Sequence, residues 1–350
     1  MAAKQRKKGQ KQSICSIILA AGKGTRIGLT KTHKTCLPVG GRAVIIRSIE
    51  AYRVAGISSH VVVVGADAQH VLKTVVSAFS DVLFAYQPEP LGTGNAAKCG
   101  VEVLSSVRYD GDILVTAGDK LVEAKIIKKM IRTFQSSRLD CLFLVAPKEL
   151  SPDSGRVIFD EKDQPVRIVE TADIRRARVL SQMLEKAEQG LLSPDFVAQA
   201  IATEGLPRQK ARLAYGALYD FSTRTVTMSN DELLEEVPTQ KTSFRVPFGK
   251  RSRRISPEEA DSAEYVNLSV YLLKEEALEF AVKKIKADNA QGEEYLTDIV
   301  EILAGAKKGD RRRFKLGTMC GDDPHQVMGF NNLEELRAIE EYIREQEVWM

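Results

Sequence analysis

The residues best suited to chemistry lie in a glycine-rich segment near the N-terminus. Residues 19–26 read LAAGKGTR and directly follow an apolar run, and the block LPVGGRA comes at residues 37–43. A strand that ends in such a turn presents several backbone N–H groups to one point, which suits a phosphate. Lys23, Arg26 and Lys34 add three cations around it. The pattern predicts a phosphate-binding loop; the alternative is a tight structural turn with solvated basic side chains.

The glycine spacing separates this loop from those of dinucleotide-binding proteins. Gly22, Gly24 and Gly28 form GxGxxxG, whereas the dinucleotide fingerprint is GxGxxG followed about twenty residues later by an acidic residue that ends a second strand. No acidic residue stands at that place in this chain. The spacing therefore argues against a nicotinamide or flavin cofactor.

An acidic residue follows the apolar run at residues 113–116. Asp119 lies in the sequence ILVTAGDK, at the carboxyl end of a predicted strand. A carboxylate beside a phosphate loop is where Mg²⁺ would be held, because this ion usually takes one or two protein oxygens and leaves its other positions to phosphates and water. The alternative, an ordinary helix or turn cap, fits the spacing equally well.

A side-chain amide and a second glycine turn follow another predicted strand. Gln87 precedes the sequence LGTGNA at residues 91–96. An amide donates and accepts together, which suits the edge of a pyrimidine ring, and the backbone N–H groups of Gly92 and Thr93 could complete that recognition. The alternative is a helix N-terminus capped by Thr93.

These motifs lie on a regular alternation of predicted strands and helices. Short β-branched runs occur at residues 16–20, 61–64, 82–86, 113–116 and 141–145. Helical patterns separate them at residues 44–55, 69–78, 94–104 and 125–134. The alternation predicts an α/β protein with an open, mostly parallel sheet and flanking helices. Ligands of such sheets lie beyond the carboxyl ends of the strands, where the glycine loop, Gln87 and Asp119 all fall.

The pattern changes after residue 155. Short strands are predicted at residues 157–159 and 166–170, which is typical of a small antiparallel flap, and the next strand begins only at residue 266. Residues 173–262 between them begin as an amphipathic helix, so we expect a mainly helical insertion. The predicted organisation is therefore a basic tail at residues 1–13, a main α/β domain at 14–172 and 263–350, and this insertion.

Composition excludes several classes of protein. The net charge is +4, but residues 4–11 carry five basic residues, so the rest of the chain is close to neutral and a nucleic-acid partner is not indicated. The five cysteines include no CxxC pair and no histidine at ligand spacing, which argues against a disulfide framework or a zinc site. The apolar stretch after the tail is too short for a signal peptide or a membrane span. We therefore expect a soluble, cytoplasmic protein without a membrane partner.

Taken together, these segments resemble the sugar-nucleotide pyrophosphorylases, most closely the bacterial N-acetylglucosamine-1-phosphate uridylyltransferases. The similar blocks run in family order from residue 14 to near residue 342, apart from the insertion. They are LAAGKGTR, Lys34 with LPVGGRA, QPEPLGTGNA, GDK, SGRVIFDEKDQPVRIVE, NAQGEEYLTDIV and MGFNNLEEL. The block NAQGEEYLTDIV at residues 289–300 is a very specific match.

The resemblance implies a GT-A-like (Rossmann-like) fold that uses Mg²⁺ to join UTP and a sugar 1-phosphate, with release of pyrophosphate. It assigns Lys23 and Arg26 to the triphosphate and Lys34 to the essential lysine beside the reacting phosphates. The remaining positions that it implies are Leu19, Ala20, Ala21, Gly22, Gly24 and Thr25 for the nucleotide, Gln87, Gly92 and Thr93 for uracil and ribose, Asp119 and Asn331 for the metal, and Gly155, Glu170 and Asn267 for the sugar.

The chain also departs from the family pattern on the sugar side of the site. Asn95 stands where the family usually has histidine, and Lys120 and Leu121 follow Asp119, so that the usual proline is missing. Leu268 and Ser269 replace a threonine and a glycine beside the predicted sugar contact. These changes leave the preferred nucleotide and sugar open.

The insertion is the largest departure, because it separates two predicted sugar contacts. A lid over the acceptor is the favoured hypothesis, and a dimer interface or a docking surface are alternatives, so the chain could form a homo-oligomer through the insertion. The hexapeptide repeats of bifunctional relatives do not follow in this sequence, which predicts a stand-alone uridylyltransferase or one domain of a longer protein.

Two other functions compete with a pyrophosphorylase. A glycosyltransferase on a related fold would use a DxD-like metal motif, but Lys120 and Leu121 follow Asp119. A non-catalytic nucleotide-sugar sensor would be expected to lose Lys34 or the metal ligands, and none is lost. The presence of all these charged residues favours catalysis, because clustered cations such as Lys23, Arg26 and Lys34 would only repel one another without an anionic ligand.

Overall fold

A computed structural model describes residues 13–22, 32–237, 241–248, 251–321, 323–330 and 332–348. Its centre is a sheet of nine strands in that part of the chain, with β8 and β16 attached beside the main path β10-β9-β13-β6-β1-β4-β5. Four neighbouring strands run parallel, namely β1 (Ile14–Ala20), β4 (Ser59–Val64), β5 (Val82–Tyr86) and β6 (Asp112–Ala117), and β16 runs parallel to β8. The others are β8 (Cys141–Pro147), β9 (Arg156–Phe159), β10 (Pro165–Val169), β13 (Tyr265–Lys274) and β16 (Leu316–Cys320).

The antiparallel part of the sheet carries the predicted sugar contacts. Strand β13 runs antiparallel to both β6 and β8, and β9 and β10 form the flap that the sequence predicts. Three shorter pairs are attached to the domain: β2 (Pro38–Val39) with β3 (Arg42–Ala43), β7 (Lys120–Val122) with β17 (Val327–Gly329), and β14 (Lys307–Lys308) with β15 (Arg311–Arg312).

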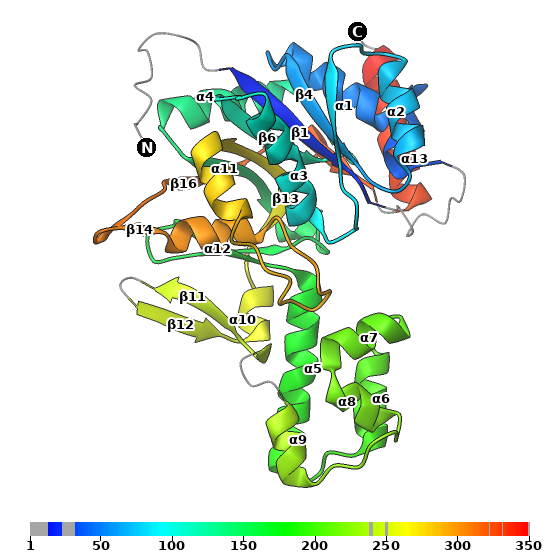
Figure 1. Cartoon of the computed structure of the whole chain (residues 1–350), viewed down its shortest axis with the longest axis vertical. Helices are drawn as coiled ribbons and strands as arrows, with labels where there is room; N and C mark the ends of the chain where they lie inside the picture. The colour runs from blue at the N-terminus through cyan, green and yellow to red at the C-terminus, as the bar shows by residue number, and fades with distance from the viewer. Residues whose placement is uncertain are drawn as a thin grey trace.

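Helices cover both faces of the sheet, as Figure 1 shows. One face packs on α1 (Val44–Val54), α2 (Ala68–Val76) and α4 (Ala124–Ser136), and the other on α3 (Thr93–Ser106), α11 (Glu275–Val282) and α12 (Asp298–Gly305). Because successive strand residues point to opposite faces, Ile17 joins one core and Ile18 the other, and both are fully buried. This explains why the strands read as continuous apolar runs instead of alternating ones.

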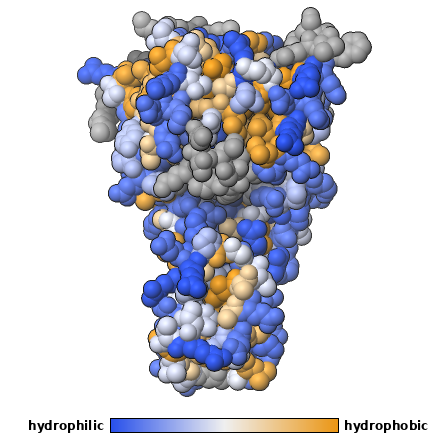
Figure 2. Space-filling view, turned by 90° about the vertical axis from the view of Figure 1, so that its right-hand side faces the viewer, coloured by the Kyte–Doolittle hydropathy of each residue, from blue (hydrophilic) through white to orange (hydrophobic). Residues whose placement is uncertain are grey.

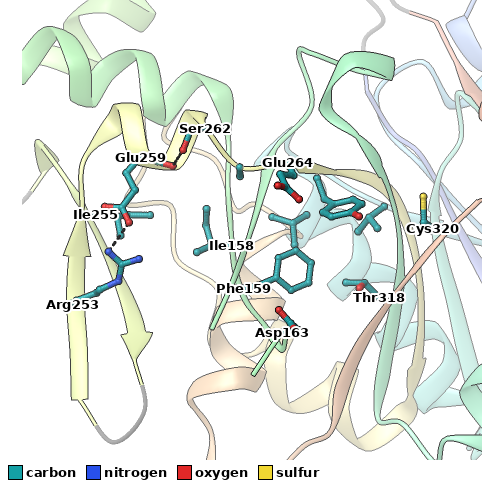
Figure 3. Close-up of a pocket in the computed structure, with 14 residues that line it drawn as sticks. Ile158, Phe159, Asp163, Arg253, Ile255, Glu259, Ser262, Glu264, Thr318 and Cys320 are labelled. Atoms are coloured by element: carbon teal, nitrogen blue, oxygen red, sulfur yellow. Dashed lines mark hydrogen bonds and ion pairs between the residues drawn. The ribbon is translucent and has the colours of Figure 1, made fainter. Parts of the chain in front are cut away.

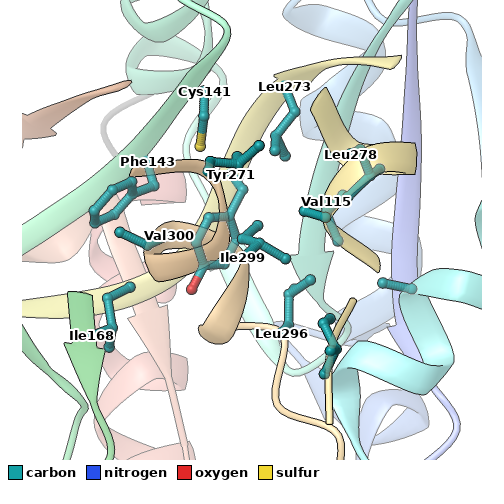
Figure 4. Close-up of a cluster of buried hydrophobic side chains, with 14 of the residues drawn as sticks. Val115, Cys141, Phe143, Ile168, Tyr271, Leu273, Leu278, Leu296, Ile299 and Val300 are labelled. Carbon is teal, nitrogen blue, oxygen red and sulfur yellow. The ribbon is translucent and has the colours of Figure 1, made fainter. Parts of the chain in front are cut away.

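The core beneath the antiparallel strands is built around Tyr271. Its ring lies 5.7 Å from that of Phe143, centroid to centroid, at an interplanar angle of 34°. Figure 4 shows Ile299, Val300 and Leu296 closing over this pair from α12 and the chain before it. The packing fixes α12 and the preceding loop against the sheet.

The C-terminal helix α13 (Leu333–Val348) packs on a separate apolar cluster close to β7. Its Leu336 and Ile339 contact a group that includes Leu37, Leu121 and Phe330, all of them buried. The end of the chain is thereby tied to the residues that follow the glycine loop and Asp119.

The insertion has its own apolar core. It contains α5 (Thr171–Glu188), α6 (Pro194–Ala202), α7 (Arg208–Tyr215), α8 (Ala217–Ser222), α9 (Asn230–Glu236), the hairpin of β11 (Phe244–Phe248) and β12 (Arg251–Ile255), and α10 (Pro257–Asp261). Leu180, Met183, Val197 and Leu218 are buried at its centre. Serine caps begin several of these helices: Ser193 caps α6, which has a proline in its first turn, and Ser229 forms a capping box on α9.

The insertion projects away from the sheet, with α5 as its stem (Figure 1). In Figure 2 the molecule narrows below the sheet domain into this part, where hydrophilic and hydrophobic surface residues alternate. No helix in the described ranges is both long enough and apolar enough to cross a lipid bilayer.

Candidate active site

A lysine and an aspartate meet at the carboxyl ends of β1 and β6. Asp119 follows β6, whose end is joined to β1 by a hydrogen bond from the Gly118 N–H to the Leu19 carbonyl at 2.8 Å. Lys34 begins the short 3₁₀ helix η2 (Lys34–Cys36), and its Nζ donates to Asp119 Oδ2 at 2.5 Å. The same ammonium lies 5.0 Å from the centroid of the buried Phe330 ring, a cation–π contact. The predicted catalytic lysine and metal ligand are thus adjacent.

The donor atoms of Asp119 fit a divalent cation. Its Oδ1 is buried and has no hydrogen-bond partner in the described part of the chain. An unsatisfied carboxylate oxygen beside a predicted phosphate site is a suitable ligand for Mg²⁺, which binds oxygen and needs few protein ligands. No group of three His, Cys, Asp or Glu side chains that could hold a metal occurs among the described residues. Asn331, the other predicted ligand, lies outside those residues.

A histidine that sequence reasoning did not single out anchors the glycine loop. His33 Nε2 lies 2.8 Å from the Gly22 carbonyl oxygen, which can only accept, so Nε2 carries the proton. Its Nδ1 accepts from the Thr35 hydroxyl at 2.9 Å. Burial lowers the pKa of His33, which favours the neutral ring that this pattern requires. The ring therefore ties the beginning of the loop to the helix that carries Lys34.

The described part of the loop ends at this anchor. Leu19 and Ala20 close β1, and the buried Ala21 leads to Gly22. The other predicted nucleotide contacts, Lys23, Gly24, Thr25 and Arg26, lie outside the described residues, as do residues 1–12 of the predicted tail.

Gln87 organises the second glycine turn from within. Its buried amide nitrogen donates to the Gly92 carbonyl and to Asn95 Oδ1, each at 3.0 Å. Both N–H donors are therefore used inside the protein. Gly92 has φ +114°, and a Cβ there would lie 2.5 Å from the Glu294 carbonyl oxygen, so only glycine fits. Contact of Gln87 and Gly92 with a base stays a prediction.

The loop at residues 289–297 clamps this turn. The Glu294 N–H donates to the Leu91 carbonyl at 2.6 Å, and the Gly94 N–H donates to the Glu294 carbonyl at 2.7 Å. Thr93 does not cap its helix through its side chain; its hydroxyl oxygen accepts from the Leu296 N–H at 3.0 Å. The sequence marked this loop only as a family block, because such long-range bonds leave no local signal.

The three predicted sugar contacts lie together, although they come from three different strand ends. The Asn267 N–H donates to the Gly155 carbonyl at 2.9 Å. A Cβ on Gly155 would lie 3.2 Å from Glu170 Oε1, which itself accepts from the Thr297 hydroxyl at 2.9 Å. Burial raises the pKa of the Glu170 carboxyl, and the Thr297 hydrogen bond opposes that shift. Thr297 is a further site residue that sequence reasoning missed.

These three residues line a cavity of about 830 Å³. The cavity is also bounded by β7 and β17, by Gly321 and residues 323–326, and by α13. The polar side chains on its wall include Lys120, Ser154, Ser269, His325 and Glu335. Its position beside Asp119 makes it the place where a second substrate could meet a bound nucleotide.

Comparison with known proteins places the chain in a family of nucleotidyltransferases. The sequence profile of the MobA-like NTP transferase domain matches residues 16–199, more than half of the chain. The chain belongs to the MobA-like NTP transferase family.

Two curated relatives of this MobA-like transferase are named bifunctional protein GlmU. That of Geotalea uraniireducens (strain Rf4) is 25% identical over 337 residues, which cover 95% of this chain and 53% of the relative. That of Staphylococcus haemolyticus (strain JCSC1435) is 34% identical over 164 residues, 47% of this chain and 35% of the relative. The chain thus spans about half the length of its curated relatives or less, and the resemblance seen in the sequence is confirmed.

A solved structure has a similar fold. A UDP-glucose pyrophosphorylase complexed with UDP-glucose superimposes on this MobA-like transferase with a TM-score of 0.55 at 14% sequence identity, and the match covers 96% of this chain and 100% of the other. The likeness concerns the fold alone, and it confirms the mostly parallel, GT-A-like architecture expected from the sequence.

A second cavity, of about 700 Å³, contains none of the predicted site residues. It lies between the sheet edge and the insertion, and Figure 3 shows Ile158 and Phe159 on one side and Arg253 with its partner Glu259 on the other. It shares Val145 and Cys320 with the larger cavity. We therefore take the 830 Å³ cavity as the candidate substrate site, because it is lined by the predicted sugar contacts.

Proposed function

We propose that this chain is a Mg²⁺-dependent nucleotidyltransferase that joins UTP and N-acetylglucosamine 1-phosphate, or a related sugar 1-phosphate, to give the UDP-sugar and pyrophosphate. One observation carries the proposal: the Lys34–Asp119 pair stands at the carboxyl ends of the parallel strands, beside a cavity lined by Gly155, Glu170 and Asn267. The similarity to the GlmU proteins along 95% of the chain supports it.

The reaction needs two anions to come together. An oxygen of the sugar phosphate attacks the α-phosphorus of the nucleotide, the bond from that phosphorus to the bridging oxygen breaks, and pyrophosphate leaves with the electron pair. The protein supplies no nucleophile, so its residues must align the reactants and offset their repulsion. Bound at Asp119, with Asn331 as the further ligand that the resemblance implies, Mg²⁺ would neutralise phosphate charge.

Lys34 is suited to the same task, since its ammonium is held in place before any substrate binds. Its side chain is only 13% exposed and lies between Asp119 and the Phe330 ring. When Asp119 shares its charge with a cation, the ammonium becomes free to bind a phosphate oxygen. A preorganised cation of this kind costs little reorganisation during the reaction.

On the sugar side, Glu170 offers a carboxylate to sugar hydroxyls, and Gly155 leaves the space for them. The missing Cβ matters, because it would lie 3.2 Å from Glu170 Oε1 and 2.8 Å from Ile168 Cγ2. Asn267 adds an amide from β13, whose oxygen also accepts from the Ser269 N–H at 3.1 Å. These groups can orient a sugar ring towards Asp119.

A panel of nucleoside triphosphates against several sugar 1-phosphates tests the proposal, with released pyrophosphate as the readout. We expect the highest kcat/KM for UTP with N-acetylglucosamine 1-phosphate, and loss of the activity when EDTA removes Mg²⁺. Absence of pyrophosphate with every pair would overturn the proposal. Sugar transfer from a UDP-sugar without pyrophosphate would point to a glycosyltransferase instead.

A further inference from the structure

Lys120 is a cation on the wall of the sugar cavity that no predicted role accounts for. It directly follows Asp119 and begins β7, where it pairs with Gly329 of β17. A Cβ on Gly329 would lie 2.6 Å from Lys120 Nζ, 2.7 Å from its Cδ and 2.9 Å from its Cε. The aliphatic part of Lys120 therefore lies flat across the glycine, and any side chain at position 329 would displace it.

The charge balance of the cavity makes this amine distinctive. Among the described residues that line the cavity, Lys120 is the only lysine or arginine. The carboxylates on the same wall are Asp153, Glu170, Asp323 and Glu335. The Lys120 amine makes no direct ion pair or hydrogen bond within the described part of the chain, whereas Lys34 is paired with Asp119. Burial lowers the pKa of the Lys120 amine, and the more distant charges of Asp119 and Glu335 oppose that shift.

Burial without a direct hydrogen bond disfavours the charged amine, and an anionic ligand bound to it would offset that cost. The four carboxylates on the wall disfavour an anion where no cation offsets them. An anionic group is therefore expected at Lys120, while an uncharged sugar ring can lie towards Gly155, Glu170 and Asn267.

We propose that Lys120 binds the phosphate of the sugar 1-phosphate and thereby sets the direction in which this substrate lies in the cavity. The inference rests on the proposed function. The phosphate must reach the nucleotide near Lys34 and Asp119. Lys120 directly follows Asp119 and lines the same cavity as the residues assigned to the sugar. It is a substrate-binding residue in this role, distinct from Lys34.

The variant Lys120→Met keeps the aliphatic arm and removes the charge. We expect the KM for N-acetylglucosamine 1-phosphate to rise about 10- to 100-fold, as for loss of a hydrogen bond to a charged group, while the KM for UTP changes less than about twofold. Lys120→Arg should restore part of the affinity. Lys128→Met on the exposed face of α4 is the matched control and should behave as wild type.

Direct binding separates this inference from the proposed function. In calorimetry with Mg²⁺ present, N-acetylglucosamine 1-phosphate should bind Lys120→Met at least about tenfold more weakly than wild type. This result supports the inference even if the wild type releases no pyrophosphate. Equal affinities in the two proteins would overturn it, as would wild type that binds no sugar 1-phosphate. A loss confined to glucuronic acid 1-phosphate would also overturn it, because Lys120 would then recognise a sugar carboxylate.

Discussion

Lys34 and Asp119 each compensate the charge of the other. Their side chains are 13% and 27% exposed, so removal of one would leave the other charge poorly solvated. The two oxygens of Asp119 differ, because Oδ2 accepts from Lys34 whereas Oδ1 has no partner in the described residues. A cation can therefore bind this carboxylate without first breaking the ion pair.

We expect Asp119→Asn and Lys34→Ala each to lower the rate of pyrophosphate release by about 10² to 10³-fold or more, because each removes charge that offsets phosphate repulsion. Initial rates with UTP and N-acetylglucosamine 1-phosphate measure the effect, and circular dichroism checks that the fold survives. Lys128→Met again serves as the control. Near-normal rates in either variant would refute the assignment of these two residues.

Ser269 holds a backbone conformation that glycine adopts more easily. Its φ is +59°, in a bulge of β13 close to Asn267. A left-handed conformation costs a residue with a Cβ roughly 1–2 kcal/mol. The serine thus keeps the local strain while it adds a hydroxyl to the cavity wall.

We expect Ser269→Gly to raise the free energy of unfolding by about 0.5–1 kcal/mol. Urea denaturation at neutral pH measures the change. Ser262→Gly is the control, because Ser262 has φ −76° and gains nothing from glycine, so that variant should be neutral or less stable. If Ser269→Gly lost stability as well, the strain would be absent and the hydroxyl would have a structural partner.

At the level of elements, β1 and β4 are joined by a buried polar pair as well as by their backbones. His60 Nδ1 lies 2.8 Å from the hydroxyl of Ser16, its register partner, and His60 Nε2 accepts from Arg53 Nε at 3.4 Å. Because Nε2 must accept, the ring is neutral. Burial, assisted by Arg53, lowers the pKa of His60 to about 4. The β1–β4 pair thus contains a histidine, His60, that stays neutral well below its usual pKa.

This pair predicts a pH dependence of stability. Since the pKa is about 4 in the folded state and 6.5 in the unfolded state, the unfolded chain binds the proton more readily, and stability falls as the pH drops from 6.5 towards 4. The expected loss between pH 7 and 4.5 is about 2 kcal/mol from this residue. Urea denaturation at both pH values should show it in wild type, and His60→Gln should be less sensitive by that amount. An equal pH response in the two proteins would contradict the assignment.

For the molecule as a whole, the sequence predicts what depends on local pattern. The strands, their order and the position of Asp119 follow from apolar runs and from the rule that parallel strands end at one edge. The partners of polar groups do not follow, because distant segments supply them. Gln87 uses both N–H donors inside the protein, and His33 anchors the loop from eleven residues away. The hairpin within the insertion was not predicted, because Pro247 and the basic run at residues 251–254 do not show the apolar alternation of a strand.

The insertion contacts a loop beside the candidate site and, in its described residues, does not cover the cavity as a lid would. None of its described residues lines the 830 Å³ cavity. Instead, α7 rests on the loop at residues 289–297: Lys210 pairs with Glu293 at 3.3 Å, and a Cβ on Gly292 would lie 2.5 Å from a methyl carbon of Leu213. The stem helix adds a bond from the Ala290 N–H to the Asp173 carboxylate at 2.6 Å. In this conformation the insertion supports the loop that clamps the predicted base-binding turn.

If that support matters, weakening it should affect the nucleotide more than the sugar phosphate. We expect Leu213→Ala to raise the KM for UTP about fivefold, which corresponds to roughly 1 kcal/mol of lost packing, with little change in the KM for N-acetylglucosamine 1-phosphate. Leu191→Ala is the matched control, since both leucines belong to the insertion and are 60% exposed, but the contact with Gly292 is made by Leu213. A change in the sugar-phosphate KM alone would favour a lid over the acceptor, whereas no change in either would leave the contact without a role in binding. Because Lys210 and Leu213 both contact this loop, the comparison distinguishes support of the nucleotide turn from closure over the cavity.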